Sequence, residues 1–136
     1  MKASLASGVT STTKLKVDRE RTIDFMGEQA RVYATPMLVR DIEFACRDLL
    51  LAHLDSGEDS VGTRVELDHI AATLLGMAVT LTVTIAEIKG RAVTLEVEGR
   101  DNIETICRGR HSRFVVDVKT TEARLATKAK KAGLLA

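Results

Sequence analysis

The chain has 136 residues, of which 20 are basic and 19 acidic, so its formal charge is only +1 at pH 7. So balanced a charge creates no overall field that would attract nucleic acid or a membrane surface, and we expect neither as a partner. The length suits a single domain, and because aromatic residues make up only 3% of it, aliphatic side chains must fill its core.

Residues 1–13 are rich in serine, threonine and alanine and predict a flexible N-terminal arm. They lack the continuous apolar region of a signal peptide, and no apolar run of about 20 residues in the chain could span a bilayer. We therefore expect a cytoplasmic protein whose domain covers residues 14–121. From Leu15 to Phe25 apolar and polar residues alternate, which predicts an edge or outer strand.

The clearest element is a helix from about Pro36 to His53. Thr35 stands in the expected N-cap position, and the proline follows at the first helical position, where its missing NH costs nothing. The polar cluster over residues 55–60 ends the helix. Apolar residues form two adjacent stripes, which predicts a largely buried helix: Leu38, Ile42, Ala45 and Leu49 in one, and Val39, Cys46 and Leu50 in the other.

From Thr63 onward the hydrophobic period changes to two, so Val65, Leu67 and His69 point to one side of a half-buried strand. A turn over residues 71–76 precedes three more segments of alternating hydrophobicity, 77–88, 91–99 and 103–119. The last is one long strand or two strands joined near Gly109. Short turns between these segments predict an antiparallel meander. Residues 122–136 form a basic tail rich in helix-forming residues.

One long buried helix, entered from an N-terminal strand and followed by a twisted antiparallel sheet, predicts an α+β protein with the hot-dog fold. In that fold the antiparallel sheet wraps around one long central helix. Ketosteroid-isomerase-like cones and other single-helix α+β folds are open alternatives, because one sequence leaves topology underdetermined.

Several polar residues interrupt this pattern. Glu43 interrupts the apolar stripe of the helix, where burial disfavours an idle charge, so it is functional, paired with a partner such as Arg40 or Arg47, or at a solvated helix position. His69 faces inward, either as a hydrogen-bonded core residue or as a group that exchanges protons near neutral pH. Thr35 is explained by its N-cap position. A hydroxyl beside unpaired NH groups at a helix start can also stabilise a carbonyl oxygen that becomes negative.

Other polar positions are weaker candidates. Gly62 is either a turn glycine or a point where a backbone NH can approach a substrate. Arg113 reads as a surface charge on a half-exposed strand. Asp41 could form a carboxylate pair with the helix glutamate, whereas Glu66 and Asp68 point to the outer face of their strand.

Motifs of several other reaction types are missing from the sequence. There is no GxSxG elbow, no phosphate-binding glycine loop and no HExxH pair. Cys46 and Cys107 lie in apolar segments and have no CxxC or Cys/His ligand spacing. We therefore expect reduced core thiols, no metal and no cofactor.

The segments YATPMLVRDIEFACRDLL and SVGTRVELDHIAATLLGMAVTLTV resemble the fluoroacetyl-CoA thioesterase family of hot-dog enzymes. The family pattern is a threonine at the start of the helix, a glutamate eight residues later within ExAC, and a histidine 26 residues further on within HxAAT. Here these residues are Thr35, Glu43 and His69. A glycine seven residues before the histidine matches Gly62, and a basic residue of the final strand matches Arg113. The resemblance covers about residues 33–118.

This resemblance implies hydrolysis of the thioester between a short acyl group and coenzyme A. Glu43 would attack the carbonyl or activate water, His69 would assist proton transfer, and Thr35 would orient Glu43 or steady the carbonyl. The NH of Gly62 would mark the position of the carbonyl or water, and Arg113 would organise the pocket or bind the substrate. The resemblance also implies a homodimer with its pockets near the subunit interface.

Enzymes of this family that act on fluoroacetyl-CoA carry phenylalanines in a lid shortly before the helix. Here the corresponding segment, MGEQARVY, has only Phe25 and Tyr33 nearby, so we expect another small acyl-CoA as substrate. Two alternatives stay open. A non-catalytic acyl-CoA-binding hot-dog module is favoured if Glu43 is exposed, and a hot-dog hydratase or dehydratase is disfavoured because its Asp/His helix signature is absent.

Overall fold

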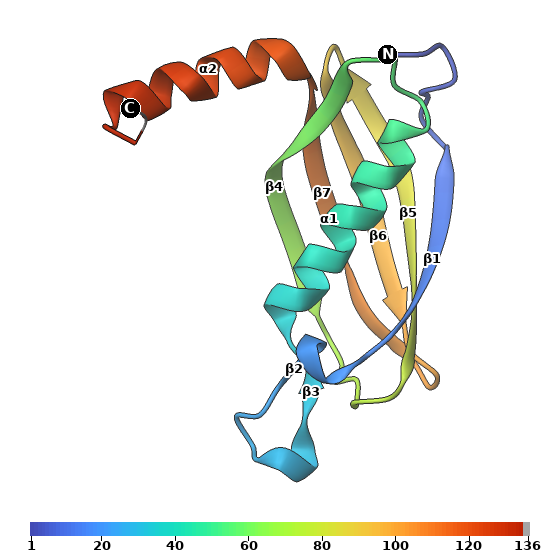
Figure 1. The fold of residues 1–136 in the computed structure, drawn as a ribbon. Helices are drawn as coiled ribbons and strands as arrows, with labels where there is room; N and C mark the ends of the chain where they lie inside the picture. The colour runs from blue at the N-terminus through green and yellow to red at the C-terminus, as the bar shows by residue number, and fades with distance from the viewer. Residues whose placement is uncertain (135–136) are drawn as a thin grey trace.

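A five-stranded antiparallel sheet curves around one long helix in the computed structural model, which describes residues 1–134 (Figure 1). The helix is α1 (Thr35–Leu51), and a second helix, α2 (Val118–Lys131), projects away from the end of the last strand. The strand order is β1-β5-β6-β7-β4. The strands are β1 (Thr10–Lys16), β4 (Glu58–His69), β5 (Ala78–Lys89), β6 (Ala92–Arg100) and β7 (Thr105–Asp117). The prediction of an α+β fold with a sheet wrapped around a central helix is confirmed.

Helix α1 buries one face against this sheet. Its buried residues recur every three or four positions, as an amphipathic helix requires: Leu38, Asp41, Ile42, Ala45, Cys46, Leu49 and Leu50. The predicted N-cap was wrong, because the capping residue is Ala34, which is extended, and Thr35 is already helical. The Ala34 carbonyl accepts the NH groups of Met37 and Leu38, both at 3.0 Å. The Thr35 hydroxyl is therefore not needed to cap the helix.

Strands β5, β6 and β7 form the predicted meander. From Val79 to Ile85 every second residue of β5 is buried, and the threonines between them face outward, which is the period of two expected for a strand with one solvated face. The β5–β6 turn contains Gly90, whose φ of 60° favours glycine. Strand β7 is continuous, so the alternative of two strands joined near Gly109 does not apply.

Strand β4 lies at the edge of the sheet, paired with β7. It begins at Glu58, five residues before the predicted start, so Gly62 lies within a strand and not at the end of a loop. A bulge between Gly62 and Arg64 shifts the register. Beyond the bulge His69 is paired with the buried Cys107, and directly paired residues share a face of the sheet. His69 therefore faces α1, as predicted.

The N-terminal residues lie against the domain. Leu5 is buried in the core, and the amino group of Met1 forms ion pairs with Asp55 and Glu58. Strand β1 begins at Thr10 and pairs with β5, so the structured part starts before the predicted boundary at residue 14. The flexibility of residues 1–13 stays a prediction.

The strand predicted to run as far as Phe25 ends earlier. After β1 the Asp18 side chain accepts the NH of Arg21 and caps a 3-10 turn (Arg19–Arg21), which bends the chain out of the sheet. A small two-stranded sheet follows, formed by β2 (Thr22–Ile23) and β3 (Val32–Tyr33), and it projects beyond the start of α1 (Figure 1). Its loop leaves Phe25 and Met26 exposed.

Helix α2 includes part of the predicted basic tail and begins at Val118, four residues before the expected boundary. The Asp117 side chain caps it by accepting the NH of Thr120. None of the residues of α2 is buried, so packing against the domain contributes little to its stability. Within residues 1–134, no helix is long and apolar enough to cross a bilayer.

Candidate active site

The predicted site residues fall into two groups along α1. Thr35 and His69 are in contact at the start of the helix, whereas Glu43 contacts Arg113 and lies beside Gly62 further along. Eight residues of helix separate Thr35 from Glu43, which is about 12 Å along the helix axis. One chain therefore does not bring the three predicted catalytic residues together.

Thr35 and His69 form a hydrogen-bonded pair. The Thr35 hydroxyl lies 2.8 Å from Nδ1 of His69. The other ring nitrogen, Nε2, is buried and has no hydrogen-bond partner among residues 1–134. Burial lowers the pKa of His69, so the imidazole is neutral near pH 7 and one ring nitrogen keeps a lone pair. An imidazole in this state can donate a proton at one nitrogen or accept one at the other.

A cavity of about 490 Å³ opens beside this pair. Its walls are mostly apolar and come from the β2–β3 segment, the start of α1 and the turn after β4: Ile23, Phe25, Val32, Tyr33, Ala34, Thr35, Pro36, His69, Ile70, Ala71 and Ala72. Phe25 is 86% exposed and stands at its edge. Tyr33, by contrast, is buried with its ring edge-on to that of His69, so it is a wall residue and not part of a lid.

Glu43 is held by Arg113, a partner that the sequence did not indicate. Nη1 of Arg113 donates to Oε2 of Glu43 at 3.1 Å. The arginine is only 4% exposed, whereas the side chain of Glu43 is 46% exposed in the single chain. The prediction that Arg113 is a surface charge was wrong, because its position in β7 faces the helix. The expectation of a buried Glu43 was likewise wrong for the chain taken alone.

The two arginines proposed from sequence as partners of Glu43 bind elsewhere. Arg47 makes two hydrogen bonds to Asp59, of 3.0 and 2.7 Å, and Arg40 lies over the ring of Phe44. Both arginines nevertheless line a second cavity, of about 280 Å³, together with Glu43. The full lining is Pro36, Val39, Arg40, Glu43, Phe44, Arg47 and Arg113. Pro36 belongs to both cavities, which are therefore neighbours along α1.

The remaining donors of Arg113 bind two residues that sequence reasoning missed. Nε donates to the Ser60 hydroxyl at 2.7 Å, and Nη2 donates to the Ser60 carbonyl at 2.8 Å. Nη1 also lies 3.1 Å from Nε2 of His111. The alternation of side chains along a strand could have identified His111. It precedes Arg113 by two positions, so both side chains point to the same face of β7. Ser60 gave no such signal, because it was assigned to a loop.

Gly62 makes room for the Glu43 carboxylate. A Cβ atom at this position would lie 2.9 Å from Oε2 of Glu43 and 3.2 Å from Cε1 of His111, both closer than normal contact. Its φ is not in the left-handed region, so a turn does not explain this glycine. A larger residue would displace the carboxylate, which makes close approach the reason for a glycine here.

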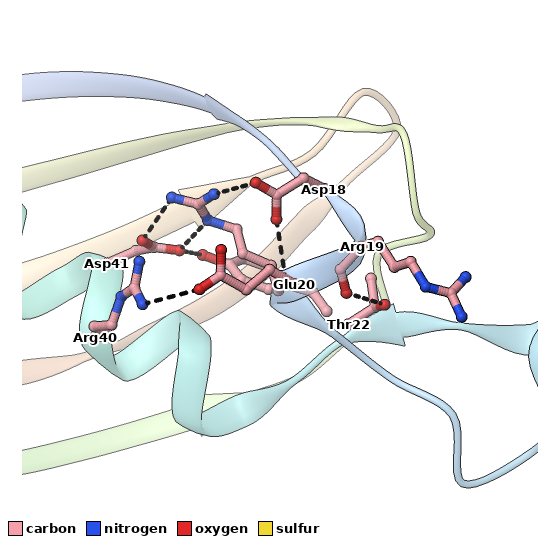
Figure 2. Close-up of polar contacts among 8 residues, drawn as sticks. Asp18, Arg19, Glu20, Thr22, Arg40 and Asp41 are labelled. Carbon is pink, nitrogen blue, oxygen red and sulfur yellow. Dashed lines mark hydrogen bonds and ion pairs between the residues drawn. The ribbon is translucent and has the colours of Figure 1, made fainter.

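Asp41 belongs to a different cluster and does not pair with Glu43. It accepts two hydrogen bonds from Arg21, of 2.9 and 3.1 Å, and a third from the hydroxyl of Tyr33. Asp18 and Asp41 both pair with Arg21, and Figure 2 shows the ion pair between Arg40 and Glu20 beside these two aspartates. The Asp41–Glu43 carboxylate pair considered from sequence is therefore absent.

The remaining polar candidates do not form a second reactive centre. Glu66 and Asp68 line a groove of about 600 Å³ on the other face of the sheet, as the strand period predicts. Burial raises the pKa of Cys46 to about 12 and that of Cys107 to about 11, so both stay protonated near pH 7 and are poor nucleophiles. Within residues 1–134, no three His, Cys, Asp or Glu side chains are arranged to hold a metal ion.

Solved structures match nearly the whole of this architecture. A thioesterase superfamily member from Thermus thermophilus is 27% identical and superposes with a TM-score of 0.87 over 96% of this chain and 98% of its own. A variant of the fluoroacetyl-CoA-specific thioesterase FlK, solved with fluoroacetate and CoA, is 28% identical with a TM-score of 0.79 over 86% of this chain and 99% of its own. The fold and these matches define the protein as a thioesterase with the hot-dog fold.

Two sequence matches identify the family within the hot-dog thioesterases. A family model described as fluoroacetyl-CoA-specific thioesterase matches residues 17–119. The fluoroacetyl-CoA thioesterase of Streptantibioticus cattleyicolor is 33% identical over 101 residues, which are 74% of this chain and 73% of that protein. The chain belongs to the fluoroacetyl-CoA-specific thioesterase family, as the spaced pattern of Thr35, Glu43 and His69 predicted.

Proposed function

We propose that this thioesterase hydrolyses the thioester between coenzyme A and a short acyl group, with Glu43 as the reacting carboxylate. The observation that carries the proposal is that only one oxygen of this carboxylate is hydrogen-bonded. Arg113 holds Oε2, whereas Oε1 has no hydrogen bond to any residue among 1–134, and Glu43 lines a cavity. A carboxylate oxygen with a free lone pair can attack a thioester carbonyl or remove a proton from water. Either route requires the same free oxygen.

Thr35 and His69 supply the complementary chemistry. Their hydrogen bond fixes the ring of His69 and leaves Nε2 directed away from Thr35. If Nδ1 carries the proton and donates it to the Thr35 hydroxyl, that hydroxyl can pass its own proton to the departing thiolate of coenzyme A, since Thr35 lines the cavity whereas Nε2 is buried. The Thr35 side chain also lies at the positive end of the α1 dipole, where negative charge on the thioester oxygen is stabilised.

We propose that a homodimer completes the site, with Thr35 and His69 of one protomer facing Glu43 of its partner. The two groups are about 12 Å apart along α1, which is too far for both to act on one carbonyl within a single chain. Strand β4 is an edge strand with two exposed valines, Val61 and Val65, and the nearby Phe44 and Phe114 are exposed as well. An edge strand with an apolar surface favours association with a second copy. A twofold axis would then produce two equal sites.

Substrate recognition follows from the walls of the two cavities. Arg40 and Arg47 lie beside Glu43 and are 46% and 40% exposed, so they can bind the phosphates of coenzyme A. Gly62 leaves space for the Glu43 carboxylate itself, and we propose that its backbone NH marks the position of the thioester carbonyl or of water. Phe25 is the single phenylalanine at the cavity beside His69, so we propose a small acyl group other than fluoroacetyl. A cytoplasmic location also stays a prediction.

The first test is release of coenzyme A from a series of acyl-CoAs with two to eight carbons. The wild type should release CoA fastest from the shorter members, and Glu43→Gln should release almost none. Glu96→Gln is the matched control, because Glu96 pairs with Arg110 on the other face of the sheet. Equal rates in the wild type and Glu43→Gln would remove Glu43 from the mechanism.

The second test is complementation between two inactive variants. Glu43→Gln and His69→Gln, co-expressed with different tags and purified through both, give heterodimers in which one site carries both substitutions and the other carries neither. We expect such heterodimers to recover about half of the wild-type activity per dimer, since each holds one intact site out of two. Recovery would not occur if Glu43 and His69 acted within one chain, because every site would then carry one substitution.

The exposure of Glu43 in the single chain favours one competing function, a non-catalytic module that binds acyl-CoA. The two functions differ in turnover and not in binding. Calorimetric titration with a thioether analogue of acetyl-CoA should show binding for both. Release of free CoA from the thioester itself is expected only of the enzyme, and binding without release would select the module.

A further inference from the structure

We infer that Ser60 and His111 are positioning residues for hydrolysis: they fix the Arg113 guanidinium, which in turn fixes the Glu43 carboxylate. This inference rests on the proposed function of Glu43. Neither residue touches the carboxylate directly through a hydrogen bond in the structure, so each acts through Arg113.

The three residues form a buried cluster behind Glu43. Ser60 is 5% exposed, His111 is 1% exposed and Arg113 is 4% exposed. Ser60 binds the guanidinium at two points, with its hydroxyl and with its carbonyl, and these two bonds set the plane of the group. His111 adds a third point at Nη1. A guanidinium held at three points cannot turn, so its bond to Glu43 has a single direction.

The hydrogen bonds of His111 determine its tautomer. The backbone carbonyl of Arg64, 2.8 Å from Nδ1, can only accept, so Nδ1 carries the proton. Nε2 then has a lone pair, and it accepts from Nη1 of Arg113. Burial lowers the pKa of His111, and the adjacent guanidinium acts in the same direction, so the neutral ring that this arrangement needs is favoured. His111 therefore acts as an acceptor for Arg113 and not as an acid.

The direction of Arg113 matters because arginine pairs with carboxylates most strongly through two parallel bonds. Here Arg113 uses one nitrogen for Glu43 and keeps Nε and Nη2 on Ser60. A guanidinium released from Ser60 could turn to occupy both oxygens of Glu43. The free oxygen would then be lost, and with it the ability to attack or to remove a proton.

The test is a pair of serine variants on neighbouring strands. Ser60→Ala removes the bond to Nε of Arg113, whereas Ser112→Ala removes only a 3.3 Å contact with Thr94 of β6, on the other face of the sheet. We expect Ser60→Ala to lower kcat about 10-fold with KM changed less than about twofold, because catalytic geometry is altered and binding is not. Ser112→Ala should behave as the wild type. A rise in KM at constant kcat in Ser60→Ala would overturn the inference.

Variants of His111 separate its acceptor from its bulk. His111→Gln keeps an amide oxygen near the position of Nε2, and we expect it to retain at least about a third of kcat. His111→Leu fills the space without an acceptor and should lose about 10-fold or more. Equal loss in both variants would mean that packing, and not acceptance from Arg113, is what His111 provides. Melting temperatures verify that each variant is folded at the assay temperature.

A double substitution remains informative even if His111→Leu does not fold. The ammonium of Arg113→Lys has no guanidinium plane for Ser60 to orient, so Ser60→Ala should change kcat less than about twofold in that background. Independent, multiplicative effects would overturn the inference. Failure of this inference is distinct from failure of the proposed function. An active Glu43→Gln would remove the proposed function. An inactive Glu43→Gln with fully active Ser60→Ala and His111→Leu would remove only the positioning roles of Ser60 and His111.

Discussion

Two carboxylates that stand two residues apart on α1 have opposite relations to their arginines. Asp41 is 6% exposed, and both of its oxygens are bound, by Arg21 and by the Tyr33 hydroxyl. Glu43 is 46% exposed and has one oxygen bound, while its partner Arg113 is the buried member of the pair. Residues at this spacing point to different sides of a helix, so Asp41 meets the β2–β3 segment and Glu43 meets β7.

The difference shows that the role of an ion pair depends on which member is buried. A buried carboxylate with both oxygens bound, such as Asp41, ties chain segments together and presents no free oxygen to a substrate. A buried arginine that presents a partly free carboxylate, as Arg113 does, provides a reactive group held in place from behind. Burial of the Tyr33 hydroxyl and its bond to Asp41 raise the pKa of Tyr33, so it remains a donor to the first cluster.

The largest expected effect is that of Glu43→Gln on turnover. Loss of a positioned nucleophile or base should lower kcat by about 10²- to 10⁴-fold. Because the carboxylate is nearly half exposed, the free energy of unfolding should fall by only about 1 kcal/mol or less. Steady-state CoA release and urea denaturation measure the two quantities. A large loss of stability with normal turnover would contradict the comparison.

Asp41→Asn should show the reverse pattern. Removing the charge of the buried Asp41 leaves Arg21 with only the exposed Asp18 as its counter-charge, so we expect the free energy of unfolding to fall by about 3 kcal/mol, with kcat of the folded enzyme nearly unchanged. Asp18→Asn is the control, since Asp18 also pairs with Arg21 but is 51% exposed and should cost less than about 1 kcal/mol. Equal costs for Asp41 and Asp18 would show that burial does not distinguish them.

The pH dependence of kcat/KM tests whether the neutral form of His69 is required together with Glu43. Burial lowers the pKa of His69 below its ordinary value of 6.5, so the neutral ring persists as the pH falls through 6.5. We expect the acid limb assigned to His69 to have its midpoint below pH 6.5. The same shift means that stability contributed by the neutral ring is complete above pH 6.5 and decreases below it. A midpoint above 6.5 would assign the limb to another group.

The smallest expected effect is that of Thr35→Val. Because Ala34 is the N-cap, removal of the Thr35 hydroxyl should not cost the roughly 1 kcal/mol of a lost cap. It should lower kcat about 10-fold through the lost bond to His69, and Thr35→Ser should retain most of the activity. Kinetics and thermal unfolding of both variants decide between the roles. A destabilised Thr35→Val with normal kcat would restore the capping role.

Periodicity in the sequence was sufficient for the helix and the meander, because their burial repeats along the chain. It failed at the start of β4, where three consecutive polar residues read as a loop. Glu58 binds the N-terminal amino group, Asp59 binds Arg47 and Ser60 binds Arg113, so each is satisfied by a partner far away in the sequence. Such partners do not appear in a local pattern, and polar residues with tertiary partners are tolerated in strands.

The candidate site divides in the same way. Spacing identified Thr35, Glu43 and His69, but it could not show that the first and last are in contact while the second is not. Thr35 looked like a cap because a hydroxyl before a proline suits that position, and its bond to His69 depends on how β4 returns to the helix start. Ser60 and His111 were missed because their contacts with the site depend on the orientation of the buried Arg113 guanidinium.

Helix α2 shows that the small net charge of the chain does not reflect an even distribution of charge. It carries Lys119, Arg124, Lys128, Lys130 and Lys131 against a single acidic residue, Glu122, and stands away from the domain. Since the whole chain has a formal charge of only +1, the rest of the molecule is net acidic. The near-neutral total is thus the sum of a basic helix and a net acidic remainder, so positive charge is concentrated on α2.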